Sequence, residues 1–308
     1  MHIGAKIGAG QYEKRAFLIL HFQKPRRRRV GTYSANSRLG IVFWTVLLSF
    51  ALLGPLCVGA EDAETSSDEQ QEANNFSDWM HETTRAAKVT FTDKKNLKIL
   101  GVTALGSAAL ITTRADESIR DTVDGWGLSS GVGDAGYVLG GIGPPLLSLG
   151  LYAHGKLNDN ERSIEASKVL STALAIDAVS TGAMKIVIGR RGPDDSDNSK
   201  IFNPFSLDDR VFPSGHTSFS FTTATVMAEL YDDRPAVAIA GYTTATLIGI
   251  ARISDDSHWA SDVLFGAVKG YLIGKTVTRL HEKGMLKKVD IIADVSPEGS
   301  YFGLGVRF

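Results

Sequence analysis

Six long apolar segments follow one another along the chain and constrain its fold more than any other feature. Each is rich in Ala, Gly, Leu, Ile, Val and Thr, and polar stretches separate one from the next. Apolar runs of this length exceed ordinary strands and are typical of helices packed against each other. They predict an all-α six-helix bundle, with helices over Leu97–Thr113, Ala135–Gly155, Ser163–Ile188, His216–Tyr231, Ala236–Ile253 and Trp259–Leu280.

Most of these segments fall short of a comfortable membrane span, which takes about 20 predominantly apolar residues. The uncharged stretch Ala236–Ala251 has only 16 residues, and Asp177 interrupts the third segment. The second segment contains Pro144-Pro145, which should break or kink its helix. We therefore expect a periplasmic or peripherally membrane-associated protein, with an integral inner-membrane protein as the alternative.

The first sixty residues have the organisation of a signal peptide. A basic region around Arg26–Arg29 precedes the uncharged run Ile41–Leu53, and Val58-Gly59-Ala60 offers small residues for cleavage. We expect residues 1–60 to be removed after secretion across the inner membrane. A membrane anchor that is retained is the alternative.

The remaining chain is acidic and lacks cysteine. Residues 1–60 hold nine of the 33 basic and one of the 34 acidic residues, so the remainder has a formal charge of −9. This excess of negative charge speaks against nucleic acid as a partner. Cys57 is the chain's single cysteine and lies inside the signal peptide, which excludes disulfide and thiol chemistry in the mature protein.

Three parts follow the signal peptide. Residues 61–90 are acidic and polar, and predict a largely disordered lead-in. Residues 91–286 contain the helical domain, and residues 287–308 predict a β-hairpin whose second strand, Tyr301–Phe308, alternates with period two. A lone hairpin is marginal in water, so residues 289–308 should pack on the bundle or associate with a membrane surface or an outer-membrane component.

The first chemical pattern joins Arg252, His258 and Asp262. If the sixth helix begins near His258, the spacing of four residues puts His258 and Asp262 on one face. A carboxylate that receives the Nδ1 proton fixes the tautomer and makes Nε2 more nucleophilic. Arg252 ends the fifth helix and can bind two phosphate oxygens. An ordinary surface His–Asp pair is the alternative.

The second pattern is Pro213-Ser214-Gly215-His216, a loop that runs into a helix. Gly215 permits close backbone approach, and the first N–H groups of the helix can point at an anion. Ser214 adds a hydroxyl donor, and His216 could protonate a leaving oxygen. A serine N-cap followed by an exposed histidine is the alternative. Lys185, near the end of the third helix, could either satisfy helix carbonyls or bind phosphate.

Together these patterns resemble the phosphatidic acid phosphatase type 2 superfamily, which also contains the vanadium haloperoxidases. That family reads K-x-x-x-x-x-x-R-P, then P-S-G-H, then S-R-x-x-x-x-x-H-x-x-x-D. The second motif is intact here, and the third departs only in having Ala251 where Ser is usual. The first keeps Lys185 and Pro193 but has Gly192 at the arginine position. The resemblance covers about residues 97 to 284 and implies the six-helix fold.

The resemblance also implies roles for individual residues. His258 would be the nucleophile that becomes phosphorylated, Asp262 would orient it, and His216 would be the general acid. No metal and no cofactor is implied for the phosphatase members. The residues implied to bind phosphate oxygens are Lys185, Ser214, Gly215 and Arg252, with Arg191 as our candidate to replace the missing family arginine.

These assignments predict a metal-independent phosphatase that hydrolyses a phosphomonoester or pyrophosphate through a phosphohistidine. The substrate is a phosphorylated lipid or a small phosphate ester, and the sequence does not distinguish between them. A vanadate-dependent haloperoxidase is one alternative. A catalytically weakened envelope protein, with Gly192 as the mark of decay, is another.

Overall fold

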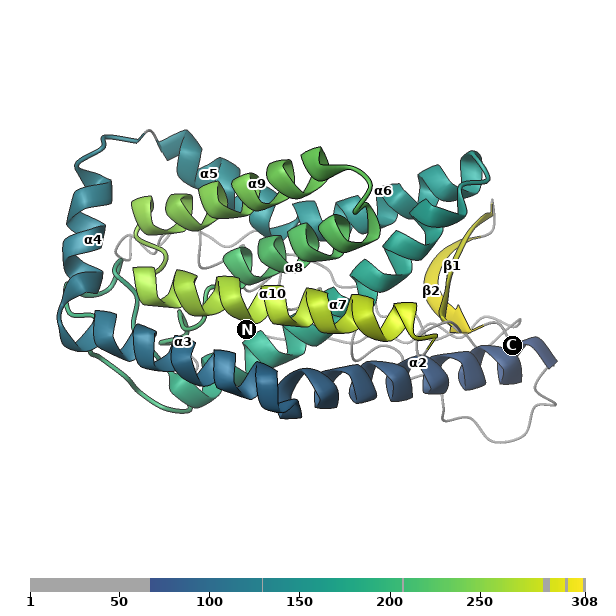
Figure 1. Ribbon diagram of the computed structural model, residues 1–308, viewed down its shortest axis with the longest axis horizontal. Coiled ribbons are helices and arrows are strands. Elements are labelled where there is room, and N and C mark those ends of the chain that lie inside the picture. The colour runs from purple at the N-terminus through teal and green to yellow at the C-terminus, as the bar shows by residue number, and fades with distance from the viewer. Residues whose placement is uncertain (1–66, 129, 207, 285–288, 297–298, 307–308) are drawn as a thin grey trace, which may run out of the picture. The chain divides into compact units, whose positions relative to one another are not determined.

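The computed structural model describes residues 67–308 apart from 129, 207, 285–288, 297–298 and 307–308 (Figure 1). The predicted signal peptide, and with it the question of its cleavage, lies outside the described residues. The described helices and strands are α2 Ser67–Thr92, α3 Lys94–Thr112, α4 Ala115–Asp124, α5 Ser130–Gly141, α6 Gly143–Leu157, α7 Glu161–Ile188, α8 Gly215–Leu230, α9 Pro235–Ser254, α10 Ala260–Glu282, β1 Val289–Ser296 and β2 Gly299–Val306.

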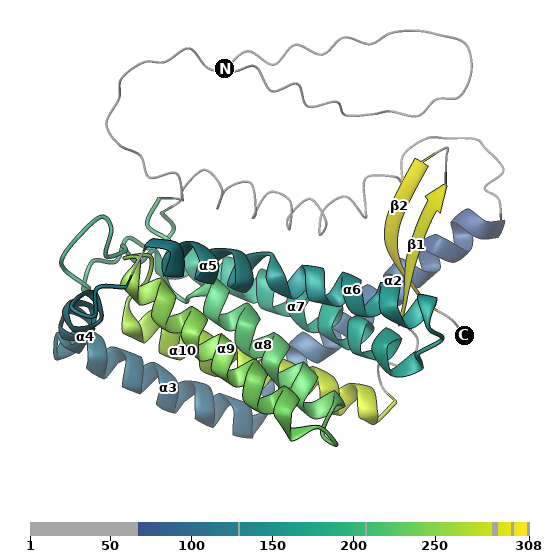
Figure 2. The same cartoon turned by 90° about the horizontal axis from the view of Figure 1, so that it is seen from above.

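The predicted all-α fold is confirmed, and five of the six apolar segments form single helices, α3, α7, α8, α9 and α10. The second segment forms two helices, because the chain breaks at Ile142, directly before Gly143 and the double proline. Pro144 and Pro145 occupy the first turn of α6, where a missing backbone N–H removes no intrahelical bond. The prolines therefore interrupt the apolar segment, as expected, and divide it into α5 and α6 (Figure 2).

Two helices extend beyond the sequence-based expectation. The lead-in is helical from Ser67 onward, so α2 covers part of the acidic stretch for which composition favours disorder. α4 follows α3 after a bend of 75° at Arg114, whose φ of 63° is left-handed. α4 is short and polar, and it has no apolar run from which a helix could be predicted. The bend brings α4 into contact with α9 and α10.

α10 is the central helix of the bundle and contacts α2, α3, α4, α7, α8 and α9 (Figure 1). Its closest neighbour is α8, and glycines permit this approach. A Cβ at Gly266 would lie 2.6 Å from the Ser214 carbonyl oxygen, and one at Gly270 would lie 2.2 Å from the Ser218 carbonyl oxygen. Glycines four residues apart share one helix face. This glycine seam fixes the start of α8, where the Pro-Ser-Gly-His motif lies, directly against α10.

A buried ion pair crosses the middle of the bundle. The ammonium of Lys269 on α10 contacts the carboxylate of Asp177 on α7, and both side chains are fully buried. The same carboxylate accepts hydrogen bonds from Ser218 at 2.8 Å and from Thr222 at 2.6 Å, both on α8. Thr181 adds a third hydroxyl donor at 3.0 Å. The charge that appeared to interrupt the third apolar segment is thus satisfied inside the bundle.

We expect Lys269→Met to lower the free energy of unfolding by about 3–5 kcal/mol, because it leaves the Asp177 carboxylate buried without its cation. Combining Lys269→Met with Asp177→Leu should recover most of this loss, since no charge then remains buried. Denaturant unfolding of the detergent-solubilised protein measures both effects. The matched control is Lys275→Met, which breaks the more exposed pair between α10 and Glu229 on α8 and should cost at most about 1 kcal/mol. Equal losses at Lys269 and Lys275 would contradict this interpretation.

The end of the chain forms the predicted hairpin. β1 and β2 pair antiparallel, with Val289 opposite Val306 and Ser296 opposite Gly299. Whether the hairpin packs on the bundle or docks elsewhere stays a prediction.

Two described helices, α7 and α9, are long and apolar enough to cross a membrane, and α3 with α4 would make a third if the bent pair is one span. Many large apolar side chains on the bundle face outward. The most exposed include Val102 at 70%, Leu105 at 73%, Val179 at 65% and Ile239 at 69%. These outward apolar faces favour the integral membrane alternative over the peripheral one.

Candidate active site

The first motif lies at the end of α7. Lys185 is in the last turn, and its ammonium donates a hydrogen bond to the Arg210 carbonyl oxygen at 2.6 Å. The helix ends at Gly189, whose φ of 57° is left-handed. A Cβ at this position would lie 1.7 Å from the carbonyl oxygen of Asn203, so the close return of the loop requires glycine. The loop after α7 therefore folds back over the helix end that carries Lys185.

The second motif begins α8. Ser214 is the N-cap residue, as the alternative interpretation of this motif expected, although its hydroxyl pairs with the Thr217 hydroxyl at 2.9 Å rather than with a backbone N–H. The Ser214 N–H donates to the Asp262 carbonyl oxygen at 3.1 Å, which ties the motif to the start of α10. Ser214 and Gly215 are buried, and Gly215 is the first residue of the helix. The first N–H groups of an α-helix have no intrahelical partner, so the start of α8 can bind an anion.

The third motif spans the loop between α9 and α10. α10 begins at Ala260, two residues after His258, so His258 and Asp262 do not share a helix face as the spacing suggested. They still meet, because the loop turns at the helix start and places His258 Nδ1 3.7 Å from Asp262 Oδ2. The backbone N–H of His258 also donates to the Arg252 carbonyl oxygen at 2.9 Å. The predicted pairing of imidazole and carboxylate is present, with a capping turn as its structural basis.

His258 is buried and kept neutral. Burial lowers the pKa of His258 to about 4, because desolvation disfavours the charged ring more strongly than Asp262 favours it, and Lys185 and Arg252 oppose the charge further. Its Nδ1 lies beyond hydrogen-bond distance of Asp262 and has no hydrogen-bond partner among the described residues. A neutral ring whose Nδ1 faces a carboxylate presents Nε2 as the basic nitrogen.

This lowered pKa has a measurable consequence for a reaction that uses His258 as a nucleophile. The neutral ring is the reactive form, and kcat/KM reports ionisations of the free enzyme. We therefore expect the acid limb of kcat/KM that belongs to His258 to lie near pH 4. A pH profile between 3.5 and 8 measures it. An acid limb at the ordinary histidine value, about 6.5, would contradict the burial effect.

Arg252 lies in the last turn of α9 with a side chain that is 1% exposed. Its Nη2 contacts the Gly133 carbonyl oxygen and lies 2.6 Å from Asp255 Oδ2. The guanidinium stacks over the ring of Tyr137, 5.7 Å from the ring centre. Its Nε is buried and has no hydrogen-bond partner among the described residues. Arg252 is thus held by one edge, while a donor on another edge is available to a phosphate oxygen.

The three motifs converge. The ring of His216 interacts electrostatically with Arg252, His258 and Lys185. It also packs against Tyr137, with ring centres 4.8 Å apart. Two histidines, a lysine and an arginine from α7, α8, α9 and the loop before α10 therefore surround one small region.

There is no space for a side chain at position 192, where the family has an arginine. A Cβ at Gly192 would lie 2.5 Å from Asp194 Oδ1 and 2.9 Å from Val211 Cγ1. A side chain at position 192 would therefore require both neighbours to move. Our candidate substitute, Arg191, pairs with Asp209, with 2.9 Å between Arg191 Nε and Asp209 Oδ1. Whether Arg191 binds phosphate stays a prediction.

We expect Arg191→Ala to raise KM and lower kcat, by about 10-fold in kcat/KM, because a guanidinium–phosphate pair is a strong charge-assisted contact. Steady-state kinetics measures both constants. Asp209→Asn is the companion variant: it releases Arg191 from its ion pair and should not reproduce the rise in KM. If Arg191→Ala changes neither constant, Lys185 and Arg252 bind the phosphate without it.

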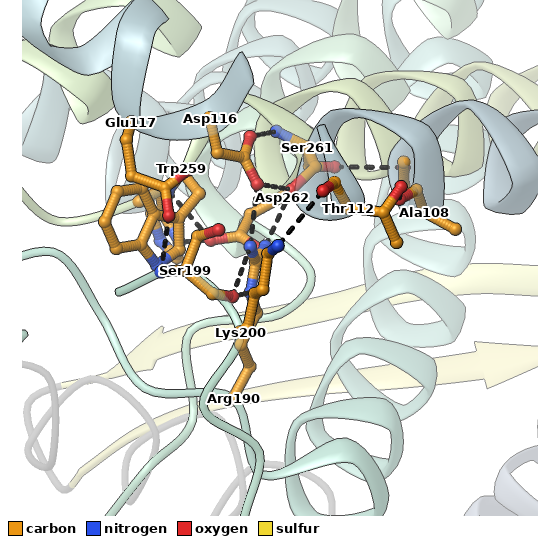
Figure 3. Close-up of polar contacts among 12 residues, drawn as sticks. Ala108, Thr112, Asp116, Glu117, Arg190, Ser199, Lys200, Trp259, Ser261 and Asp262 are labelled. Atoms are coloured by element: carbon orange, nitrogen blue, oxygen red, sulfur yellow. Dashed lines mark hydrogen bonds and ion pairs between the residues drawn. The ribbon is translucent and has the colours of Figure 1, made fainter. Parts of the chain in front are cut away.

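Sequence reasoning missed three residues around the site. Tyr137 on α5 contacts both His216 and Arg252. Arg190 is fully buried and contacts Asp262 and Asp116, and Asp116 comes from α4 (Figure 3). The Gly189-Arg190 pair was visible in the sequence, but Asp116 and Tyr137 lie in segments with no motif. Among the described residues, no group of three or more His, Cys, Asp and Glu side chains is arranged to hold a metal ion.

A comparison with known families matches the part of the chain that holds the site. Residues 167–285 match the family model of the PAP2 superfamily. This range contains every site residue expected from the sequence, from Lys185 to Asp262. The predicted resemblance to this superfamily is therefore confirmed for that segment of the chain.

Two known proteins give further comparisons. The lipid A 1-phosphatase of Porphyromonas gingivalis is 49% identical over 65 residues, which are 21% of this chain and 15% of the relative. The chain thus matches a small part of that protein's length. The crystal structure of the first transmembrane PAP2 type phosphatidylglycerolphosphate phosphatase from Bacillus subtilis covers 68% of this chain and 96% of that chain, at 20% identity and a TM-score of 0.35. A superposition this loose adds nothing to the assignment.

Proposed function

We propose that this protein is a metal-independent phosphatase that hydrolyses a lipid phosphate monoester or pyrophosphate through a phosphohistidine at His258. The observation that carries the proposal is geometric: Tyr137 contacts both His216 and Arg252, and the Arg252 carbonyl accepts the backbone N–H of His258. Lys185 lies within electrostatic range of both histidines. The cations there can neutralise phosphate oxygens, and the two histidines can supply a nucleophile and an acid.

The reaction would proceed in two displacements. His258 Nε2 attacks phosphorus while the bond to the leaving oxygen breaks, and His216 transfers its proton to that oxygen. Water then attacks the phosphohistidine and gives a proton to His216, the phosphorus–nitrogen bond breaks, and inorganic phosphate leaves. A bound phosphate anion favours a protonated imidazole beside it, which suits His216 to the role of acid. Lys185, Arg252, Gly215 and Ser214 would hold the phosphate oxygens throughout.

The apolar exterior supports a lipid as the substrate class. Side chains such as Leu105, Val179 and Ile239 are more than half exposed, which is costly in water and favourable in hydrocarbon. α7, which carries Lys185, is one of the two described helices long and apolar enough to cross a membrane. A membrane-embedded phosphatase meets lipid phosphates directly. The name of the relative in Porphyromonas gingivalis, a lipid A 1-phosphatase, points to the same class of substrate.

A phosphate-release panel tests the activity and the substrate class together. The detergent-solubilised full chain would be given a phosphatidic acid, an isoprenoid pyrophosphate, a lipid A phosphate and small soluble esters, with and without EDTA. We expect release from at least one lipid substrate that EDTA does not reduce. Release from soluble esters alone would overturn the lipid assignment, and a loss of activity with EDTA would overturn metal independence.

Fractionation tests the membrane part of the proposal. We expect the chain to remain in the membrane pellet after high salt and alkaline carbonate, and to be released by detergent. Release by osmotic shock or salt would restore the periplasmic or peripheral location that the lengths of the apolar segments suggested.

A further inference from the structure

The carboxylate of Asp262 is held by more than the histidine it faces. Its Oδ2 accepts the Trp259 N–H at 2.9 Å and faces His258 Nδ1 at 3.7 Å. Its other oxygen, Oδ1, contacts Nη1 of Arg190. Because different donors hold the two oxygens, the carboxylate cannot rotate away from His258 without breaking a buried contact.

Arg190 is itself fixed completely. Its Nε and Nη2 donate to the Ser199 carbonyl oxygen at 3.1 and 2.9 Å, and its Nη1 donates to the Ser261 hydroxyl at 2.7 Å. Nη1 also contacts Asp262, and Nη2 donates to Asp116 Oδ2 at 2.7 Å. A guanidinium has five N–H groups, so these five contacts engage all of them. Arg190 therefore has no donor left for a substrate oxygen.

Asp116 closes the arrangement from α4. Its Oδ1 accepts the Ser261 N–H at 2.8 Å, and its Oδ2 accepts the Ser261 hydroxyl at 2.6 Å in addition to Arg190 (Figure 3). The side chains of Asp116, Arg190 and Asp262 are all fully buried. One guanidinium thus bridges two buried carboxylates, and one of those carboxylates faces His258.

We infer that Arg190 and Asp116 are positioning residues that act through Asp262 to orient His258 for attack on phosphorus. This inference rests on the proposed function, because it takes His258 as the nucleophile. Asp116 lies outside the matched segment 167–285, so the family match assigns it no role. A buried ion pair is costly unless its geometry is well satisfied, and partners one step removed from a reacting group commonly set its orientation.

Two variants and two matched controls test the inference. Asp116→Asn keeps the shape of the side chain and removes its charge, and Arg190→Lys keeps the charge and removes the fork of donors. Glu117→Gln is the control for Asp116, since Glu117 is the next residue on α4 and accepts the Ser199 N–H at 3.2 Å. Arg120→Met is the control for Arg190, since Arg120 also bridges two carboxylates, but these are Asp256 and Asp197 rather than Asp262.

With p-nitrophenyl phosphate as probe, we expect Asp116→Asn to lower kcat about 10- to 100-fold and to change KM less than about twofold. Arg190→Lys should also lower kcat, and the kcat of both controls should stay within about twofold of the wild-type value. Thermal melting in detergent establishes that each variant is folded. If Asp116→Asn matches Glu117→Gln, or if it raises KM with kcat unchanged, the positioning role is wrong. Failure of Asp116→Asn to fold while Glu117→Gln folds would assign the network to stability alone and would equally overturn it.

A second readout does not depend on turnover. Nitrogen-15 NMR of the His258 ring reports which ring nitrogen carries the proton, and Asp262 should favour a proton on Nδ1. We expect Asp116→Asn to shift this tautomer balance toward Nε2–H, with no shift in Glu117→Gln. If wild-type protein and His258→Ala prove equally inactive on every phosphate ester, the proposed function fails while this measurement still decides the positioning role. An unchanged tautomer in Asp116→Asn would refute the inference even in an active enzyme.

Discussion

His258→Ala should reduce phosphate release by about 10⁴-fold or more, because removing the nucleophile eliminates the covalent route and leaves only the binding groups around the phosphate. No described side chain other than His258 combines a neutral imidazole, burial and a carboxylate facing its Nδ1. The loss should appear in kcat, since Lys185 and Arg252 still bind the phosphate. Phosphate release in single-turnover conditions measures it against the wild type.

The intermediate gives the sharper form of this test. Wild-type protein quenched during turnover of a phosphorus-32 substrate should carry an acid-labile label, and His258→Ala should carry none. His81→Ala is the control, since His81 is an exposed histidine on α2. A label that persists in His258→Ala would move the nucleophile elsewhere. A fully active His258→Ala protein would refute the phosphohistidine mechanism altogether.

The helices could be predicted from the sequence because apolar composition over a long run decides between helix and strand without tertiary information. The helical bundle could therefore be predicted without any sequence motif. α4 escaped prediction because it has ten residues and a polar surface, and it is defined by its contacts with α9 and α10 rather than by its composition. Asp116 was missed together with α4, since its importance depends on what the 75° bend after α3 brings together.

For the arginines after α7, the motif does not predict the direction of the side chains. Helical spacing predicts side-chain directions only as far as Gly189, where the left-handed backbone ends the helix. Beyond it, Arg190 turns inward to Asp262 and Arg191 turns to Asp209. Residues adjacent in sequence thus have different environments, and only the fold distinguishes them. By contrast, His258 and Asp262 lie close together as expected although His258 precedes the helix, because a capping turn and a helix turn both bring residues four apart together.

His216→Ala should lose more activity on substrates whose leaving group must be protonated than on substrates whose leaving group departs as an anion. On an alkyl phosphate or a lipid phosphate, whose alkoxide is a poor leaving group, we expect a loss of about 10²- to 10⁴-fold. On p-nitrophenyl phosphate, whose phenolate leaves without protonation, the loss should be at most about 10-fold. Labelling of His258 should therefore persist in His216→Ala with the aryl substrate and be strongly slowed with the alkyl substrate.

The surroundings of His216 define the control for this experiment. His216 packs on Tyr137 and interacts with Lys185 and Arg252, so its removal could also disturb phosphate binding. Disturbed binding would raise KM for both substrates alike, whereas a missing acid lowers kcat for the alkyl substrate selectively. His154→Ala, which removes a histidine on α6 hydrogen-bonded to Ser163, should affect neither substrate. Equal losses on aryl and alkyl phosphates in His216→Ala would show that this histidine positions the phosphate and that another group protonates the leaving oxygen.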